Sequence, residues 1–426
     1  MADSPAMKEH RGLFYGWIIV GACFAIAAII FGSLFTFGVF LVPFQEHFGW
    51  SSAVVSGAYS LGLLCYTGFG MLSGWGVDRF GPKKTTIVGA VIIAIGLLSA
   101  SRVNAIWQLY LVYGLIGIGA SVGYVPLTTT VSRWFSRRRG LVLGIYSAGL
   151  GFGPFVAAPV LSYIIATSSW RVAYLVLAAM TSVIITAALF LKRNPEQIGE
   201  VADGKRYGNG PISPQRKVSR AATANSGLSL RQAMRTRAFW LLCSMYLMTG
   251  IGIQMVMAHV VAYSQSTGML PITAATVLST ISGASIAGRL IIGTASDWMG
   301  RKRALLMSLA TEGVMIFWLM GSSQVWMLFL FGAIFGFAYG GHSPVFPALV
   351  GETLGLRHMG KIIGVGAFCW GMGAALGPFL AGYIVDTTGS YTSAFLVGAL
   401  GMLTAATLTL TVKKPAGVAE DTQRPG

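Results

Sequence analysis

The sequence has little charge. Only 10% of its 426 residues are Asp, Glu, Lys or Arg, whereas 54% are hydrophobic; an ordinary soluble domain carries about 25% charged residues. A soluble chain of this composition would expose large apolar patches, so we expect lipid to surround most of it. This expectation excludes a nucleic-acid-binding protein, which the net charge of +17 would otherwise suggest.

Cysteine is scarce as well. The four cysteines, Cys23, Cys65, Cys243 and Cys369, all lie in apolar runs, and none has the CxxC spacing of a metal or redox site. The sequence therefore predicts no disulfide framework, no metal site and no cofactor. We also expect no cleavable signal peptide, because the first apolar run is longer than the roughly 7–15 residues of a signal-peptide core.

Long apolar runs make up most of the chain. A helix needs about 20 apolar residues to cross the hydrocarbon of a bilayer. Twelve runs qualify, and their length predicts an all-α membrane protein with 12 transmembrane helices. They cover approximately residues 14–43, 53–73, 85–101, 106–130, 140–165, 170–191, 238–265, 272–294, 303–321, 325–349, 360–385 and 391–412.

The basic residues lie on one side of these runs. Apart from Arg102, Arg171 and Arg289, every Lys and Arg falls in a terminal tail or in every second segment between the runs. Lys and Arg accumulate on the cytoplasmic side of a membrane. We therefore expect both termini to be cytoplasmic and the protein to be a multi-pass protein of the cell inner membrane.

A polar central segment divides the chain, and the two parts repeat each other. We expect an N-terminal six-helix half over 1–191, a cytoplasmic linker over 192–237 and a C-terminal six-helix half over 238–426. The stretch 74–84 (GWGVDRFGPKK) returns as 293–303 (GTASDWMGRKR), and 170–176 returns as 391–397. Two parallel halves are a known transporter layout.

The repeated loop resembles the signature between the second and third spans of the major facilitator superfamily. The resemblance implies a gate at the cytoplasmic face formed by Asp78, Arg79, Asp297 and Arg301. In that interpretation each Asp pairs with basic residues in one gate state. The alternative is a charge cluster that only fixes the topology.

Two further stretches resemble the monocarboxylate transporter family within that superfamily. Gly16-Trp17 opens the first span, and residues 133–149 (RWFSRRRGLVLGIYSAG) open the fifth. The resemblance implies a secondary active transporter that carries short monocarboxylates, such as L-lactate and pyruvate, by alternating access. A membrane hydrolase would need a nucleophile, a base and an acid at membrane depth, and we find no such set, so we expect no enzyme.

Arg289 is the strongest candidate for substrate binding. It lies eight residues before Asp297, about 12 Å from the helix end, and shares a helix face with Ser282 and Ser285. A cation at this depth should meet an anion in a water-filled cavity. The alternative is a structural ion pair with a buried carboxylate, for which Glu312 is the main candidate.

Two positions depart from the family's proton-coupled members, which carry an Asp and a Lys where this chain has Ser285 and Phe35. Proton symport and anion exchange of the oxalate/formate type therefore both stay open. The oxalate carriers also have a second cation in the eleventh span, where this chain has Phe368 and Cys369. A single cation favours a monoanion as substrate.

Weaker candidates complete the predicted site. Tyr124 and Tyr339 could donate hydroxyls to a carboxylate, although tyrosines in spans often only pack. Phe35, Leu143, Phe368 and Cys369 are predicted to form an apolar wall around the substrate. His259 could bind substrate or carry a proton, with Glu312 as the second proton candidate and a satisfied buried histidine as the alternative. The expected partners are a small monocarboxylate, a proton and the lipid bilayer.

Overall fold

The computed structural model describes residues 14–135, 138–198, 228–355 and 359–413, and these fold into helices. The helices before the central segment form the first group. They are α1 (Tyr15–Leu34), α2 (Phe37–Phe48), α3 (Ser52–Gly68), α4 (Gly70–Phe80), α5 (Pro82–Ala100), α6 (Ile106–Ala120), η1 (Ser121–Gly123), α7 (Val125–Trp134), α8 (Arg139–Thr167), α9 (Trp170–Leu189) and η2 (Pro195–Ile198).

The helices after the central segment form the second group. They are α11 (Leu230–Ala233), α12 (Arg237–Ser266), α13 (Pro271–Met299), α14 (Arg301–Met320), α15 (Val325–Leu354), α16 (Met359–Thr388) and α17 (Tyr391–Thr411).

Twelve of the described helical segments are long and apolar enough to cross a membrane, which confirms the predicted number of spans. Three spans are interrupted: α1 and α2, α3 and α4, and α6, η1 and α7 each form one crossing. The last of these breaks precedes Pro126, which has no N–H to continue the ladder of the preceding helix.

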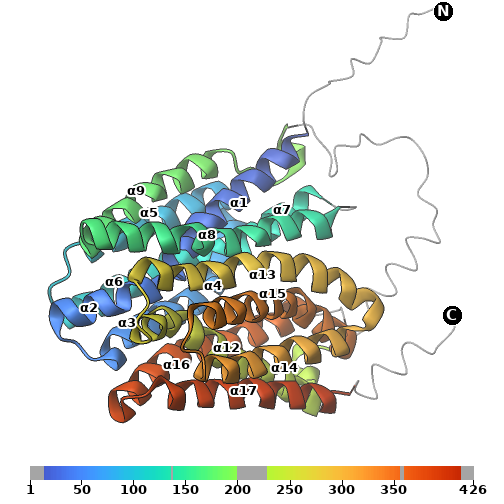
Figure 1. Cartoon of the computed structure of the whole chain (residues 1–426). Helices are drawn as coiled ribbons and strands as arrows, with labels where there is room; N and C mark the ends of the chain where they lie inside the picture. The colour runs from blue at the N-terminus through green and yellow to red at the C-terminus, as the bar shows by residue number, and fades with distance from the viewer. Residues whose placement is uncertain (1–13, 136–137, 199–227, 356–358, 414–426) are drawn as a thin grey trace, which may run out of the picture.

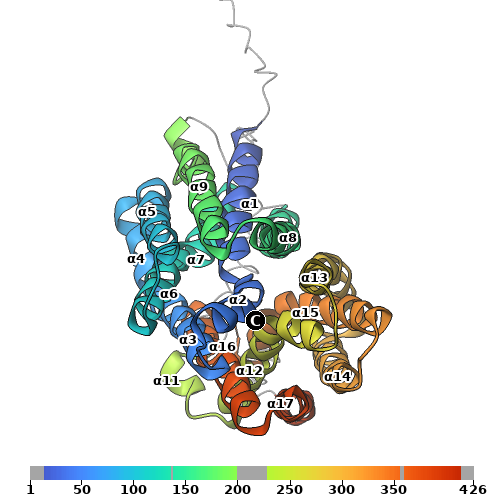
Figure 2. The same ribbon diagram turned by 60° about the vertical axis from the view of Figure 1, so that its left-hand side comes forward.

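The spans gather into two groups that meet along three helix pairs. Within the first group α1 packs on α8 and α3 on α6, and within the second α13 packs on α15 and α12 on α16. In Figure 2, α4, α5, α6 and α9 gather on the left, and α13, α14 and α15 on the right. The groups touch through α3 against α16, α8 against α13 and α2 against α12. Figure 1 shows α8 beside α13.

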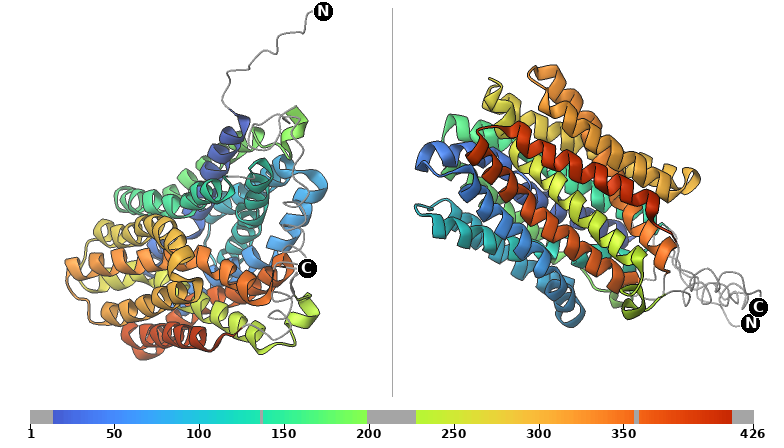
Figure 3. Two further views of the ribbon diagram at one scale, coloured as in Figure 1. Left: turned by 90° about the vertical axis from the view of Figure 1, so that its right-hand side faces the viewer. Right: turned by 90° about the horizontal axis from the view of Figure 1, so that it is seen from below.

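The helices run alongside one another, which gives the bundle two distinct ends (Figure 3). We call the basic end the one at which α1 begins, α17 ends and the turns at Gly81 and Gly300 lie. The opposite end carries the turns at Gly49, Ser168 and Gly389. The two groups of helices are in contact at the opposite end and enclose a cavity nearer the basic end, as described below.

Glycines bring α13 and α15 into close contact. A Cβ at Gly336 would overlap the carbonyl oxygen of Ile281, and one at Gly340 would overlap that of Ser285. Small residues let helix backbones approach closely where lipid supplies no hydrophobic drive between helices. The tight α13–α15 contact holds the helix that carries Arg289 against the helix that carries Tyr339.

We expect Gly336→Ala to destabilise the protein, because overpacking a close helix contact costs about 1–3 kcal/mol. Gly21→Ala is the matched control: nothing lies within 4 Å of a Cβ there, and Ala favours a helix over Gly by about 1 kcal/mol. Thermal unfolding in detergent, followed by tryptophan fluorescence, should give a lower midpoint for Gly336→Ala only. Equal midpoints for the two variants would contradict the close contact.

Candidate functional site

A cavity of about 200 Å³ lies between the two groups of helices. Its wall contains Arg289 and a set of aromatic side chains from both groups, and the residues lie in the middle and basic-end parts of their helices. They are Tyr66, Thr67, Gly70, Ser121, Tyr124, Val125 and Leu150 from the first group, and Tyr246, Arg289, Tyr339, His342, Ser343, Phe346, Pro347, Ile363, Ala367 and Trp370 from the second.

Two of the helix breaks form part of this wall. Tyr66 and Gly70 lie on either side of the break between α3 and α4, and Ser121 begins η1 while Tyr124 follows it. Interrupted helices are typical of binding sites in transporters, because an irregular backbone is tolerated in a membrane where it lines a cavity. The local interruption of these spans therefore places backbone and tyrosine side chains around the cavity.

The cavity is closed toward the opposite end by contacts between the two groups. The Asp386 carboxylate in α16 accepts hydrogen bonds from the Ser52 and Ala53 N–H groups at the start of α3, at 2.9 and 2.7 Å. His259 Nε2 donates to the Pro378 carbonyl at 3.0 Å and lies 3.2 Å from Ser56 Oγ. These contacts join α3 to α12 and α16.

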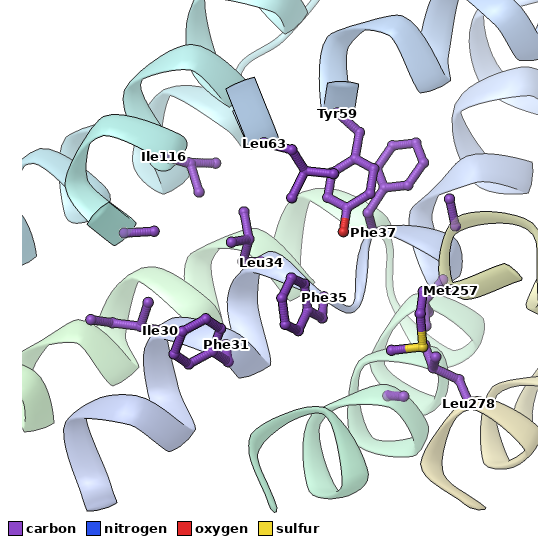
Figure 4. Packing of buried hydrophobic residues seen from close by; sticks show 14 of the residues in the cluster. Ile30, Phe31, Leu34, Phe35, Phe37, Tyr59, Leu63, Ile116, Met257 and Leu278 are labelled. Carbon is purple, nitrogen blue, oxygen red and sulfur yellow. The ribbon is translucent and has the colours of Figure 1, made fainter. Parts of the chain in front are cut away.

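Packed aromatic rings complete the closure. Phe37 stacks on Tyr59 with ring centroids 4.4 Å apart, and the Tyr59 hydroxyl donates to Gln254 Oε1 at 3.3 Å. Figure 4 shows Phe37 against Tyr59 and Phe35 beside Phe31 in the same buried layer. The exposed residues of the cavity wall include Tyr124 and Val125, at 42% and 39%. They stand at the start of α7, which runs from there to the basic end, whereas the contacts just described close the opposite end. The cavity is therefore reached from the basic end.

Arg289 is held in this cavity with part of its guanidinium unpaired. It is 8% exposed, and its Nη1 donates to the Ser147 carbonyl of α8 at 2.8 Å. Its Cζ lies 5.7 Å from the centroid of the Tyr339 ring, within range of a cation–π interaction. Its Nε is buried and has no hydrogen-bond partner. An anion in the cavity would supply an acceptor for this guanidinium.

Glu312 does not contact Arg289 but pairs with a histidine. His342 Nδ1 is hydrogen-bonded to Glu312 Oε1 at 2.7 Å. His342 reaches the cavity wall, whereas Glu312 lies behind it and is fully buried. The His342 ring also lies edge-on to the Tyr339 ring, with centroids 5.8 Å apart.

The structure brings some of the predicted site residues together and separates others. Arg289, Tyr339 and Tyr124 share the cavity wall. The remaining candidates lie outside that wall in this conformation: His259 is among the contacts of the opposite end, Phe35 and Leu143 pack with the main apolar core, Cys369 packs near Cys243, and Phe368 is exposed.

Sequence reasoning missed several functional positions. Tyr66, Tyr246 and Trp370 line the cavity, and Asp386 closes the opposite end. A carboxylate at a span end is a weak signal, but Asp386 follows an apolar run and so could have been singled out. The aromatic residues have no sequence signal of their own, since such residues occur throughout the spans.

Comparison with known proteins decides the family. A model of the Major Facilitator Superfamily matches residues 23–310 and 241–426. The chain belongs to this superfamily. It is therefore a membrane transporter, as predicted, and its relatives are transporters rather than enzymes.

Individual relatives place the chain more narrowly. Monocarboxylate transporter 13 of Bos taurus is 27% identical over 406 residues, which cover 93% of this chain and 89% of that protein. Monocarboxylate transporter 12 of Xenopus laevis is 26% identical over 411 residues, covering 91% and 86%. These relatives bear out the predicted resemblance to the monocarboxylate transporter family.

A solved structure confirms the fold. The crystal structure of a bacterial homologue of the human lysosomal transporter Spinster, in an inward-facing and unoccupied conformation, superposes with a TM-score of 0.67 at 15% identity. The match covers 98% of this chain and all of that one. The predicted major facilitator fold is thus confirmed.

The predicted gate residues of this transporter form ion pairs within their own half. Asp78 binds Arg133 at 2.9 Å, and Arg301 binds both Asp297 at 2.8 Å and Glu352 at 2.7 Å. The first pair joins α4 to α7, and the second set joins α13, α14 and α15. These pairs therefore tie helices of one group together while the cavity is reached from this end.

Arg79, the fourth predicted gate residue, makes a cation–π interaction within α4. Its guanidinium lies over the Trp75 ring of the same helix, at 5.4 Å from the centroid. The predicted role of the four residues as a gate stays a prediction.

We expect Asp386→Ala to open the contact at the opposite end. The change removes two charge-assisted hydrogen bonds between the groups, each worth about 1.5–3 kcal/mol. A cysteine at the buried position Ser56, in a variant without the native cysteines, should then react with a maleimide about tenfold faster. Glu46→Ala is the control, because Glu46 is an exposed carboxylate at the same end. An unchanged reaction rate in Asp386→Ala would show that Asp386 does not hold this end closed.

Proposed function

We propose that this chain carries short monocarboxylates, such as L-lactate and pyruvate, by alternating access and in symport with a proton. The observation that carries this proposal is Arg289. It is the one Lys or Arg among the described residues of the cavity wall, it lies deep in a span, and its Nε has no partner. A buried cation of this kind is stabilised by an anionic partner.

The chemistry of the wall favours a carboxylate as that anion. Arg offers a planar fork that can bind both oxygens of a carboxylate, and hydrogen bonds between charged groups are strong. The Tyr124 and Tyr339 hydroxyls are further donors on the same wall. Relatives named monocarboxylate transporters support the same substrate class.

Size and charge favour a small monoanion. A volume of about 200 Å³ is below the roughly 300–1,000 Å³ of pockets that take drug-sized ligands. One guanidinium neutralises one carboxylate. A second negative charge would enter a cavity of low dielectric without a partner.

The orientation of the protein follows from its charges. We propose that the basic end is cytoplasmic, because Lys and Arg accumulate there. The two termini then lie in the cytoplasm, the bundle lies in the cell inner membrane, and residues 192–237 link the halves 1–191 and 238–426. In this orientation the conformation described above is open to the cytoplasm and closed to the outside.

Proton symport makes the transport of a monoanion electroneutral. An anion that enters alone works against a negative-inside potential of about 2.3 kcal/mol per charge per 100 mV. A proton that moves with it removes this cost. The alternative is anion exchange of the oxalate/formate type, which Ser285 and Phe35 favour since neither can ionise as the family's Asp and Lys do.

We expect Arg289→Lys to reduce L-lactate counterflow in proteoliposomes about 10- to 100-fold. Lys keeps the charge but loses the bidentate fork, and a charged hydrogen bond is worth about 1.5–3 kcal/mol. Arg289→Ala should abolish saturable counterflow. Arg102→Lys is the matched control, because Arg102 lies exposed in the α5–α6 loop. Near-normal L-lactate affinity in Arg289→Ala would refute the proposed site.

We expect dicarboxylates to compete poorly with labelled L-lactate. Desolvating a second, unpaired carboxylate costs several kcal/mol, so succinate and oxalate should inhibit at least about tenfold more weakly than pyruvate. Monomethyl succinate is the control, since it has nearly the length of succinate but one charge. Inhibition by succinate equal to that by its monomethyl ester would contradict selection by a single cation.

A further inference from the structure

Glu312 and His342 form a buried ionisable pair that substrate binding at Arg289 does not use. Glu312 lies inside α14, a membrane span, and is fully buried. Its Oε1 is 2.7 Å from His342 Nδ1, and its Oε2 has no hydrogen-bond partner. An acidic side chain at membrane depth is costly, so it marks a functional site unless a structural role accounts for it.

The pair is connected to the cavity on its histidine side. His342 belongs to the cavity wall, so a proton from water in the cavity can reach its ring, and the hydrogen bond leads on to the Glu312 carboxylate. Tyr339 lies close both to this pair and to Arg289. Its ring is 5.8 Å from that of His342 and 5.7 Å from Arg289 Cζ. One aromatic side chain thus neighbours both the proposed proton-binding pair and the anion-binding group.

Arg289 is the one Lys or Arg on the part of the cavity wall that the structure describes, and His342 lines the same wall. The other ionisable side chains on the cavity wall are Tyr339 of α15, Tyr246 of α12, and Tyr66 and Tyr124 of the first group. The described residues of α16 add no ionisable side chain to the wall, and α17, which packs on α14, has none between 392 and 411. Tyrosines are neutral at physiological pH. The charge around the cavity is therefore set by Arg289 and the Glu312–His342 pair.

We infer that Glu312 and His342 together hold the transported proton, and that the charge of Arg289 couples this proton to the substrate. This inference rests on the proposed function, and it names the side chains that carry the proton. In the empty transporter the pair holds no extra proton, and its negative charge balances Arg289. The site as a whole is then neutral.

Substrate binding changes this balance. When a monocarboxylate neutralises Arg289, the charge of the pair is left without a counterion. The pair then takes one proton from cavity water, which forms either an imidazole N–H or a carboxyl O–H bond, and no other bond changes. The loaded site is again neutral. Both neutral forms can pass through a closed state of low dielectric, whereas the form with substrate and no proton carries an unpaired charge.

The test separates exchange from proton-driven accumulation. Purified full-length protein in proteoliposomes is assayed for L-lactate counterflow at equal pH and for uptake driven by an imposed inward proton gradient. The wild type should accumulate L-lactate about tenfold per pH unit, since one proton moved over one pH unit is worth one decade of concentration. Glu312→Gln, which is neutral without a proton, should retain counterflow within about threefold but lose gradient-driven accumulation.

Two further variants sharpen the result. His342→Gln keeps a donor for Glu312 but removes the side chain that connects the carboxylate to cavity water. The site with substrate then keeps the Glu312 charge, so both counterflow and accumulation should fall about tenfold. This variant also tests the pair if Glu312→Gln does not fold. Glu46→Gln, an exposed carboxylate at the opposite end, should behave as the wild type in both assays.

A direct count of protons provides a second readout. Addition of L-lactate to unbuffered protein in detergent should cause uptake of about one proton per molecule by the wild type and none by Glu312→Gln. The L-lactate Kd of the wild type should rise with pH, and that of Glu312→Gln should not.

The outcomes distinguish the two proposals. If the wild type exchanges L-lactate but ignores the proton gradient, proton symport is wrong and anion exchange is the better account. If the wild type responds to the gradient and both Glu312→Gln and His342→Gln respond equally, symport stands and the assignment of the pair is overturned.

Discussion

The cost of charge inside a bilayer shapes this protein. Chains of this composition can place ionised groups at membrane depth only where a partner or water compensates them. Arg289 and Glu312 are both buried within spans, and each has a nitrogen or oxygen left without a partner. The tight glycine contact between α13 and α15 brings the cation and the histidine partner of the acid to one cavity wall. The polar chemistry of the membrane interior is thus concentrated at one place.

The two ends of the bundle differ in the kind of contact that they use. At the opposite end, hydrogen bonds and stacked rings run between the halves, from Asp386 to the start of α3 and from His259 to α16. At the basic end, the ion pairs of Asp78 and Asp297 stay within a half. Opening of the opposite end would therefore break hydrogen bonds between the halves, whereas the ion pairs of the basic end hold helices of one half together.

Much of the architecture could be predicted from the sequence because it depends on local composition. Hydropathy decides which segments lipid surrounds, so the twelve spans follow from run length alone. Arg289 was identified for the same reason, since a lone cation within an apolar run is visible without any tertiary information. The repeated loop motif predicted two similar halves, because its Gly and Asp residues occur twice at nearly constant spacing, and its resemblance to a known signature predicted the superfamily.

The partners of these residues depend on the rotation of each helix and on how the halves meet, and apolar runs do not specify either. The structure pairs Glu312 with His342, a residue of another span, and leaves Arg289 facing Tyr339. It places Phe35 and Leu143 in the core and His259 at the closed end rather than on the cavity wall. Lipid solvates every apolar face equally, so only packing between helices, set by glycines such as Gly336, selects the faces that enclose the cavity. Composition therefore determined which residues lie in the membrane, and tertiary packing alone decided which of them meet.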